Sequence, residues 1–410
     1  MKTCRMQMGD IATIIDGDRG SNYPKQNEFF DKGFCLFLNA GNVTSEGFVF
    51  EKNSYISAEK DKALRKGKLK RGDIVYTTRG TIGNVAYYKS TVPFENIRIN
   101  SGMVILRVNE ELIDAEYLYQ YLKSTSTREY FLSFKTGSAQ PQLPIKNFSR
   151  IQINVPDISS QKHIASILSA YDDLIENNRR QIKLLEEAAQ RLYREWFVEL
   201  RFPGHEDVKI VDGVPEGWKA ETIGNVCCTI GGGTPSTKEK TYYEGGNIPW
   251  VTPTDITRNG CLILLETEKK ITEEGLAHSS AKMVPAWTIL MTSRASVGYF
   301  GICEFPVCTN QGFISCIPYQ ENMRFYLLHN LMNRVDEIRA KAGGSTYLEI
   351  SKSTFRDMKI IVPADEILNS FEESIQKLMM KMKNCKEQNR ILTSARDRLL
   401  PKLMSGEVEV

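Results

Sequence analysis

The chain repeats one sequence pattern twice, and this duplication limits what it can fold into more than any other feature. The stretch GDIVYTTRGTIGNVAYY begins at position 72, and AWTILMTSRASVGYFGI begins at position 286. Arg79 and Arg294 lie 215 positions apart, as do Gly83 and Gly298. In each copy an apolar run is followed by two hydroxyl residues, an arginine and a turn with a glycine. A duplicated pattern of this length indicates two related structural units.

The duplication continues beyond these stretches with a shorter offset. Gly137 and Phe148 recur 207 positions later as Gly344 and Phe355, and a Val-Pro pair follows in both copies. The first copy therefore holds eight more residues between its glycine positions. Eight residues is the size of a surface loop, which a fold accommodates without a change of architecture.

A long helical pattern follows each globular copy. From position 161 to 201 there is no proline or glycine, and apolar or small residues recur at alternating spacings of four and three. The second copy keeps this frame at the offset of 207. Such a heptad seam predicts a coiled coil. The apolar seam positions are Ile164, Leu168, Ile175, Ile182, Leu185 and Leu192 in the first helix and Ile375, Leu378, Met382, Leu392 and Leu399 in the second.

The two predicted helices offer each other a partner. A helix of about 38 residues is ~57 Å long and would expose its apolar seam if it stood alone. Each helix begins directly after one globule, so globules at opposite ends imply antiparallel helices. The polar seam positions Asn178 and Asn389 would then help to fix the register. Pro401 argues against a regular last turn in the second helix.

The expected fold class is α+β, with two mixed α/β globules joined by two long helices that form an antiparallel coiled coil. A pseudo-twofold internal repeat relates the two halves. Along the chain we expect a first globule over 1–157, a first helix over 158–200, a linker and second globule over 201–364, and a second helix over 365–410. Within the globules, a helix is predicted over 115–134 with a counterpart over 323–342.

Composition narrows the classes of protein to consider. Hydrophobic residues make up 41% and charged residues 25%, and the net charge is +3, which fits ordinary globular domains. The nine cysteines are scattered without a CxxC pair, a pattern typical of a reduced intracellular protein. No signal peptide and no membrane-spanning run is found, so a cytoplasmic location is expected.

The sequence offers little support for catalysis. GGGTPSTKEK at 231–240 lacks the ending of a phosphate loop and contains a proline, so a glycine-rich turn is the better interpretation. The four histidines lie far apart, and Cys303 and Cys308 are better explained as buried thiols than as metal ligands. There is no nucleotide-binding glycine loop and no methyltransferase or nuclease pattern. We therefore expect no catalytic residue, metal or cofactor in this chain.

Positive charge is concentrated in the first globule. Positions 60 to 100 hold ten Lys and Arg and three Asp and Glu, a balance of +7, whereas positions 267 to 310 hold four of each sign. With Tyr76, Tyr87 and Tyr88 interleaved, the basic region could neutralise nucleic-acid phosphates, and a merely soluble surface is the alternative. A second copy that binds DNA would depend more on polar groups, backbone amides and shape.

The arginine shared by both copies lies where a strand gives way to a loop. Arg79 and Arg294 each lie among two or three hydroxyl residues. Such a cluster can grip a phosphate or the edge of a guanine. The alternative is an arginine that holds its own loop through bonds to backbone carbonyls.

Five longer segments carry a family resemblance. They are KGKLKRGDIVYTTRGTIG at 66–83, TGSAQPQLPIKNF at 136–148, INVPDISSQKHIASILSAYDDLIENNRRQIKLLEEAAQRLYREWF at 153–197, VPEGWKAETIG at 214–224 and NRILTSARDRLLPKLMSGEVEV at 389–410. With two globules and two helical spacers in alternation, the chain resembles the specificity subunit of a type I restriction-modification system. The first globule, with RGSNYPK at 19–25 and LNAGNV at 38–43, resembles one common class of recognition domain. The second, with GGTPS at 232–236 and IPWVTPTDI at 248–256, resembles a diverged relative.

This resemblance implies a non-catalytic subunit that reads a DNA target in two separated halves. Each globule would be a target-recognition domain that reads one half through the major groove, with the helices as a ruler between them. A length of ~57 Å corresponds to at most about 17 base pairs, and about one helical turn is favoured because both domains must face one side of the duplex. The family docks two modification subunits, which use S-adenosylmethionine to methylate adenine. Restriction subunits add nuclease and translocase activity, so ATP and Mg are also expected in partner subunits.

Polar residues at turn positions common to both copies are the candidate DNA contacts, because arginine, lysine, asparagine and hydroxyl side chains can bind base edges. They are Lys25, Asn39, Asn42, Lys68, Lys70, Arg79, Thr81 and Gln142 in the first globule and Thr234, Thr254, Asp255, Arg294, Ser296 and Tyr347 in the second. Two other interpretations stay open. Two sugar- or peptide-binding modules on a coiled-coil spacer would have no affinity for duplex DNA. A self-contained DNA enzyme would act as a lone chain with a metal or methyl donor.

Overall fold

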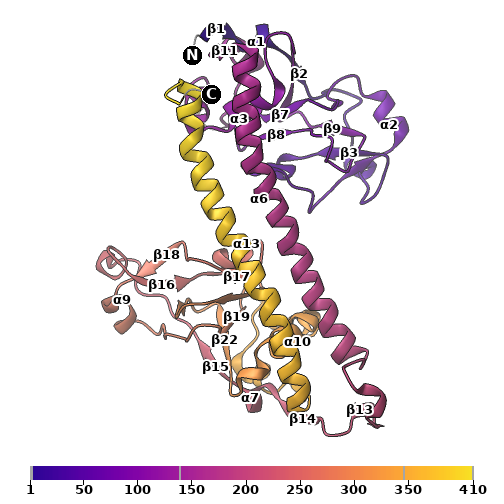
Figure 1. Ribbon diagram of the computed structural model, residues 1–410, viewed down its shortest axis with the longest axis vertical. Coiled ribbons are helices and arrows are strands. Elements are labelled where there is room, and N and C mark those ends of the chain that lie inside the picture. Colours follow the sequence, from indigo (N-terminus) through magenta and orange to yellow (C-terminus); the bar gives the residue numbers. More distant parts are fainter. Residues whose placement is uncertain (1–2, 138–139, 345–346, 409–410) are drawn as a thin grey trace. The chain divides into compact units, whose positions relative to one another are not determined.

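Two compact units divide the chain, and each contains a segment of both long helices (Figure 1). The computed structural model describes residues 3–137, 140–344 and 347–408, so positions 138–139 of the segment TGSAQPQLPIKNF and 409–410 of the last segment lie outside it. Unit 1 comprises Met1–Ile175 and Ile391–Val410, and unit 2 comprises Glu176–Arg390. The helices α6, Ile158–Tyr193, and α13, Asp365–Ser405, each contribute to both units. The expected boundaries, by contrast, give each helix a domain of its own.

Unit 1 combines short strands with short helices. Its strands are β1 (Thr3–Gln7), β2 (Ala12–Asp16), β3 (Cys35–Leu38), β4 (Val43–Thr44), β5 (Gly47–Phe48), β6 (Tyr55–Ile56), β7 (Ile74–Thr77), β8 (Val85–Tyr87), β9 (Ile97–Ile99), β10 (Met103–Val108) and β11 (Gln152–Pro156). Its further helices are α1 (Met8–Ile11), α2 (Ala58–Ala63), α3 (Ala115–Lys123), α4 (Thr125–Leu132) and α5 (Ile145–Arg150). The strands form a four-stranded sheet in the order β2-β10-β7-β8, a three-stranded sheet β6-β3-β9, and the pairs β1-β11 and β4-β5.

The four-stranded sheet of unit 1 is buried on both faces. Along β7, Ile74 and Tyr76 belong to one apolar cluster, and Val75 between them belongs to a second cluster. Val104 and Ile105 of β10 divide in the same way. Because successive side chains of a strand point to opposite faces, a sheet covered on both sides reads as a continuous apolar run. This explains why IVYT and MVILRV show no polar alternation.

Unit 2 has a main sheet with the strand order of unit 1 and one further edge strand, and a three-stranded sheet of the same kind. Its strands are β12 (Ile210–Val211), β13 (Val214–Pro215), β14 (Lys219–Thr222), β15 (Cys227–Gly231), β16 (Ile248–Val251), β17 (Ile263–Leu264), β18 (Lys269–Ile271), β19 (Ile289–Thr292), β20 (Phe300–Cys303), β21 (Cys308–Thr309), β22 (Phe313–Pro318) and β23 (Lys359–Val362). Its further helices are α7 (Ile223–Val226), α8 (Pro253–Thr257), α9 (Glu273–Ala277), α10 (Arg324–Asn333), α11 (Val335–Lys341) and α12 (Lys352–Arg356). The sheets are β15-β22-β19-β20-β17, β18-β16-β21, β14-β23 and β12-β13. In both three-stranded sheets the middle strand is antiparallel to one neighbour and parallel to the other.

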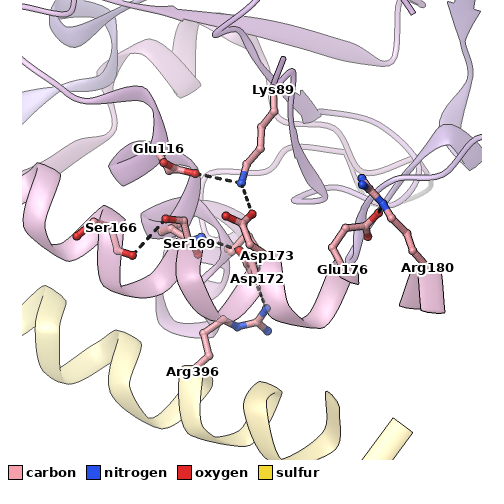
Figure 2. A network of polar contacts seen from close by, with 11 residues as sticks. Lys89, Glu116, Ser166, Ser169, Asp172, Asp173, Glu176, Arg180 and Arg396 are labelled. Carbon is pink, nitrogen blue, oxygen red and sulfur yellow. Dashed lines mark hydrogen bonds and ion pairs between the residues drawn. The ribbon is translucent and has the colours of Figure 1, made fainter. Parts of the chain in front are cut away.

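The long helices lie against each other in opposite directions within each unit. In unit 2 the Asn178 Nδ2 atom of α6 donates to Asn389 Oδ1 of α13 at 3.0 Å, while Tyr193, further along α6, contacts the earlier Phe371. In unit 1, Asp172 binds Arg396, and Ile164 shares its apolar cluster with residues beyond Arg396 on α13. Figure 2 shows the Arg396 side chain directed from α13 toward Asp172 on α6.

The predicted seam faces the interior of the units. Ile164, Leu168, Ile175, Ile182, Ile375 and Met382 are buried, and Leu185, Leu192, Leu378, Leu392 and Leu399 are partly buried. Helix α6 ends in a π-helical turn at Arg194–Val198. Helix α13 continues through Pro401, which lies between the buried residues Leu400 and Leu403.

The single helix expected over 115–134 is two helices. The Ser124 hydroxyl accepts the Thr127 N–H at 3.2 Å and so caps the start of α4 directly after α3 ends. Serine is a favoured N-cap residue because its side chain satisfies a free amide of the first turn. The counterpart over 323–342 also breaks, at Arg334 between α10 and α11.

Candidate nucleic-acid interface

Four loop segments of unit 1 meet at one polar edge. They are residues 17–19 after β2, 78–81 after β7, 100–102 before β10 and 140–143 before α5. The Thr78 N–H donates to the Gly102 carbonyl at 2.8 Å, and the Leu143 N–H donates to the Thr78 carbonyl at 2.9 Å. The Arg19 guanidinium donates to the Ser101 carbonyl at 3.3 Å. We call these four segments the loop edge of unit 1.

Unit 2 has a loop edge built by equivalent bonds. Its segments are 232–234, 293–296, 310–312 and 347–350. The Ser293 N–H donates to the Gly312 carbonyl at 2.8 Å, and the Ile350 N–H donates to the Ser293 carbonyl at 3.1 Å. The Thr234 hydroxyl forms a hydrogen bond with the Gln311 side chain. The two loop edges therefore correspond segment by segment.

A buried threonine hydroxyl shapes each arginine loop. The Thr77 hydroxyl donates to the Thr81 carbonyl at 2.5 Å and accepts the Asn84 N–H at 2.9 Å. In unit 2 the Thr292 hydroxyl likewise donates to the Ser296 carbonyl and accepts the Tyr299 N–H at 2.9 Å. A loop with both ends bound to one side chain has a defined shape, so the arginine it carries has a fixed backbone position.

A close approach that only glycine permits completes each loop edge. A Cβ atom at Gly17 would lie 2.1 Å from the Asn100 carbonyl oxygen, and one at Gly232 would lie 2.0 Å from the Asn310 carbonyl oxygen. The Asn100 and Asn310 side chains each accept the N–H two residues ahead at 2.9 Å. Asparagine stabilises tight turns in this way. The turn before β10 or β22 therefore packs directly against the backbone of the glycine segment.

The two shared arginines differ in their surroundings. Arg79 is exposed, and within the described ranges its guanidinium makes no hydrogen bond or ion pair. Arg294 is also exposed, but its Nε atom lies 3.6 Å from the Glu349 carboxylate. The threonines rather than the arginines bind the loop carbonyls, which is evidence against the loop-holding alternative for Arg79.

The predicted contacts are distributed inside and outside the loop edges. Those within them are Arg79, Thr81 and Gln142 in unit 1 and Thr234, Arg294, Ser296 and Tyr347 in unit 2. Those in other segments are Lys25, Asn39, Asn42, Lys68 and Lys70 in unit 1 and Thr254 and Asp255 in unit 2. Tyr347 is 59% exposed, so its ring is available for stacking or groove contact.

Asn42 and Asp255 hold loops together. The Asn42 side chain is 1% exposed, accepts the Asn39 N–H at 2.9 Å and donates to the carbonyls of Val49 and Lys52. The Asp255 carboxylate accepts the Thr252 N–H at 2.8 Å together with the Thr252 hydroxyl and the Glu268 N–H. Both side chains are hydrogen-bonded within their own units. The amide of Asn42 is also buried, so it is not exposed to a DNA base in this structure.

Much of the positive charge between positions 60 and 100 is used inside unit 1. Arg98 is 5% exposed and binds the Asp61 carboxylate at 2.6 Å, and Lys68 reaches the same carboxylate at 2.5 Å. Arg71 donates to the Lys89 carbonyl at 2.6 Å and lies over the ring of Tyr88. Opposing effects act on Asp61: burial raises its pKa, but Lys68 and Arg98 outweigh burial and hold the pKa below its ordinary value. The balance of +7 therefore overstates the charge available to a ligand.

Arg19, Gln311 and Glu349 belong to the loop edges but are absent from the sequence-based candidates. Arg19 lies beside Ser101 in unit 1, and Gln311 binds Thr234 in unit 2. Arg19 lies 215 positions before Thr234, so the repeat offset could have identified it. Gln311 follows Asn310 at the turn before β22, where no charge or aromatic pattern marks it.

Cys303 and Cys308 are buried free thiols of unit 2. Burial raises the pKa of both Cys303 and Cys308 to about 12, which keeps these thiols protonated and unreactive. Within the described ranges, no group of three His, Cys, Asp or Glu side chains is placed to hold a metal ion. In the same part of the chain, no helix combines the length and apolar character that a bilayer crossing requires.

The chain thus holds two α/β units, each with one polar loop edge, and two long helices that contribute to both units. The family described as "Type I restriction modification DNA specificity domain" matches residues 4–187 and 215–391. These two matches cover most of the chain, one for each copy of the repeat. The chain belongs to this family of type I restriction-modification specificity subunits.

Named relatives agree with this assignment. The chain is 26% identical to the type I restriction enzyme HindI specificity subunit of Haemophilus influenzae, with 98% of this chain and 100% of the relative covered. It is 28% identical to the MjaIX specificity subunit of Methanocaldococcus jannaschii, with 98% and 92% covered. The crystal structure of a type I restriction-modification S subunit from M. genitalium shares the fold, with a TM-score of 0.60, 16% identity and 98% and 96% coverage.

Proposed function

We propose that this chain reads a bipartite DNA target, one half with each unit, as the specificity subunit of a type I restriction-modification complex. The observation that carries the proposal is the pair of corresponding loop edges, each with an exposed arginine at the same position of the repeat. A protein that reads two half-sites needs two reading surfaces of the same construction.

The proposed contacts are polar side chains of the two loop edges. In unit 1 these are the exposed Arg19, Arg79 and Thr81 and the half-buried Gln142; Lys70 is exposed in another segment of the unit, and Lys68 is paired with Asp61. In unit 2 they are Thr234, Arg294, Ser296, Gln311 and Tyr347. Arginine and glutamine can each form paired hydrogen bonds with a purine edge, and hydroxyl groups can bind either bases or phosphates. Phosphate contacts would set the orientation, and base contacts would set the sequence.

We further propose that α6 and α13 form one antiparallel coiled coil, and that the two halves of the molecule are related by a pseudo-twofold repeat. The reversed order of helix contacts in each unit and the shared strand orders support this arrangement. An antiparallel pair of related helices would present two similar surfaces, which suits the docking of two modification subunits.

The catalytic groups would belong to the partners. We expect modification subunits to bring S-adenosylmethionine, and possible restriction subunits to bring ATP and Mg, while this chain contributes recognition alone. The assembled complex would act on DNA in the cytoplasm. The family match supports the assignment of a non-catalytic role.

The test is a matched pair of arginine variants within the complete system. Arg79→Ala is expected to relax or abolish recognition of one half-site and leave the other intact, and Arg294→Ala is expected to affect only the other half. One lost arginine–base contact removes about 1–3 kcal/mol of discrimination. Methylome sequencing of cells that carry each variant reports both half-sites directly.

The competing interpretation predicts a different result. Two sugar- or peptide-binding modules on a spacer would leave the methylome unchanged in both variants and would give no complex with duplex DNA in a gel-shift assay. A lone-chain enzyme would methylate or cleave DNA without partner subunits. If both arginine variants retain the full target, the role assigned to the loop edges is wrong.

A further inference from the structure

The two arginine loops differ in the residue that faces the arginine. Arg79 forms an isolated backbone bridge with Gln142, and Arg294 forms the equivalent bridge with Glu349. Gln142 and Glu349 are 207 positions apart, the offset that relates this part of the two copies. A neutral amide in one unit is thus replaced by a carboxylate of nearly the same shape in the other.

The backbone around the two positions is the same, so the difference is one of charge. Gln142 exchanges two hydrogen bonds with Thr136 at 2.8 and 2.9 Å, and Glu349 exchanges two with Gly343 at 3.0 and 2.8 Å. Each residue is therefore held between the arginine loop and the segment that follows the preceding helix. The pairing fixes the backbone of Glu349 beside the arginine loop, and in this structure its carboxylate lies 3.6 Å from the Arg294 Nε atom.

The ion pair itself contributes little to folding. The Arg294 Nε atom and the Glu349 carboxylate are 3.6 Å apart, and their side chains are 45% and 48% exposed. Exposed pairs of this kind are weak and screened by salt. A weak pair at a loop edge is better explained by its effect on a ligand than by its effect on the fold.

A carboxylate beside an arginine discriminates between anionic and neutral ligands. A DNA phosphate that approaches Arg294 also approaches the negative charge of Glu349, and like charges in a partly dehydrated interface repel strongly. The neutral O6 and N7 acceptors of guanine do not meet this repulsion, and a carboxylate can itself accept from the amino group of cytosine. Arg79 faces neutral Gln142 and carries no such restriction.

We propose that Glu349 is a specificity-determining residue of unit 2, which keeps Arg294 off the phosphate backbone and directs it to base edges. The inference rests on the proposed function, because it assigns a role within DNA recognition. Glu349 acts through its negative charge, which lies beside Arg294 and repels phosphate and non-cognate acceptor edges. Such a repulsive element increases specificity at the expense of affinity.

The experiment compares Glu349→Gln with the reciprocal Gln142→Glu in the complex with its modification subunits. Target duplexes are taken from the methylome, and the half read by unit 2 is the half altered by Arg294→Ala. Binding is measured to the cognate duplex and to a duplex changed in that half, over a series of salt concentrations. Melting followed by tryptophan fluorescence checks unit 2 of the Glu349→Gln variant, because all four tryptophans, at positions 196, 218, 250 and 287, lie in it.

For Glu349→Gln we expect tighter binding to the altered duplex and a loss of discrimination of about three- to tenfold, because the repulsive charge is gone. The salt dependence should steepen by about one phosphate equivalent as Arg294 gains access to the backbone. Gln142→Glu should change in the opposite direction, with weaker binding and a shallower salt dependence. The melting temperature of Glu349→Gln should stay unchanged.

The binding experiments distinguish a failure of the role proposed for Glu349 from a failure of the proposed function in DNA recognition. If the unaltered complex neither methylates nor binds duplex DNA, the proposed function fails, and the role of Glu349 fails with it. If the complex binds its target but Glu349→Gln leaves both discrimination and salt dependence unchanged, only the role of Glu349 is overturned. A shifted melting temperature with unchanged discrimination would show that Glu349 serves the fold.

Discussion

His329 is a buried base in the core of unit 2. The side chain on α10 is 1% exposed and packs against the rings of Tyr193 and Phe371. Among the described residues, neither Nδ1 nor Nε2 has a hydrogen-bond partner. Burial lowers the pKa of His329 to about 4, because the charged form would have to leave water.

This residue should make the stability of unit 2 depend on pH. The unfolded chain binds a proton near pH 6.5 and the folded chain only near pH 4, so the contribution is intact above 6.5 and is lost as the pH falls toward 4. The loss amounts to about 3 kcal/mol across that window. Urea denaturation followed by tryptophan fluorescence, at several pH values, compares wild type with His329→Phe.

The difference in unfolding free energy between wild type and His329→Phe isolates this group from the other titrating residues. We expect that difference to move against wild type as the pH falls from 7 to 4. The exposed His278, in the same unit, supplies the control variant His278→Gln. Parallel stability curves for wild type and His329→Phe would contradict the prediction.

At the scale of single residues, the sequence repeat predicted where the arginine loops lie, but it did not predict which polar side chains are free to bind a ligand. The repeated Thr-x-Arg pattern located both arginine loops, because the same buried hydroxyl is needed to shape each loop. The polarity of Asn42 suggested a DNA contact, yet its amide is used by the 39–52 loop. A sequence shows that a residue is polar, but only the fold shows which neighbours already satisfy it.

At the scale of elements, a part-buried charge cluster joins the two long helices in unit 1. The Asp172 carboxylate on α6 binds Arg396 of α13 at 2.5 Å, Lys123 at 3.0 Å and Gln120 at 2.6 Å. Burial raises the pKa of Asp172, but Lys123, Gln120 and Arg396 outweigh it and hold the pKa below its ordinary value. The next residue, Asp173, is 72% exposed and binds Lys89 at 3.2 Å (Figure 2).

Adjacent aspartates on one helix therefore provide a matched comparison. Asp172→Asn should destabilise unit 1 by about 3–5 kcal/mol, because it removes the carboxylate from the largely buried Lys123 and leaves Arg396 with Asp397 alone. Asp173→Asn should cost less than about 1 kcal/mol, as for an exposed pair. Hydrogen exchange of the amides in β7 and β10 measures unit 1, with peptides of unit 2 as the internal reference. Equal effects of the two substitutions would refute the role of the cluster.

Elements defined by contacts between nearby residues were predictable from the sequence, and those defined by distant contacts were not. The heptad pattern predicted both long helices, because their side chains pack along neighbouring turns of a helix pair. The split of the expected 115–134 helix depends on one cap at Ser124, which a hydrophobic period does not reveal. The parallel pairing of β3 with β9 joins segments about sixty residues apart, and no local pattern specifies such a partner.

At the scale of the whole molecule, the proposed ruler can be shortened by one heptad. Deleting residues 173–179 from α6 and 388–394 from α13 removes facing segments where both helices pass from one unit to the other. Seven residues keep the heptad frame and shorten a helix by ~10 Å, which corresponds to about 3 base pairs. Methylome sequencing should therefore show a target with a shorter spacer and unchanged half-sites.

Two further variants keep this experiment decisive. Deletion of six residues from each helix shifts the seam out of phase and should abolish methylation. Insertion of one heptad into each helix should lengthen the spacer, and it tests the idea even if the shortened protein does not fold. An unchanged spacer in an active heptad variant would remove the ruler from the account.

Residues near the C-terminus complete the core of unit 1. Leu400 and Leu403 belong to the same apolar cluster as Ile74 and Leu106, although they are synthesised more than two hundred residues later. Unit 2 is a single continuous stretch. During translation, unit 1 therefore lacks part of its apolar core until all of unit 2 has been synthesised. A stop codon after Arg390 would release a chain that contains all of unit 2 but lacks the α13 residues that complete the core of unit 1.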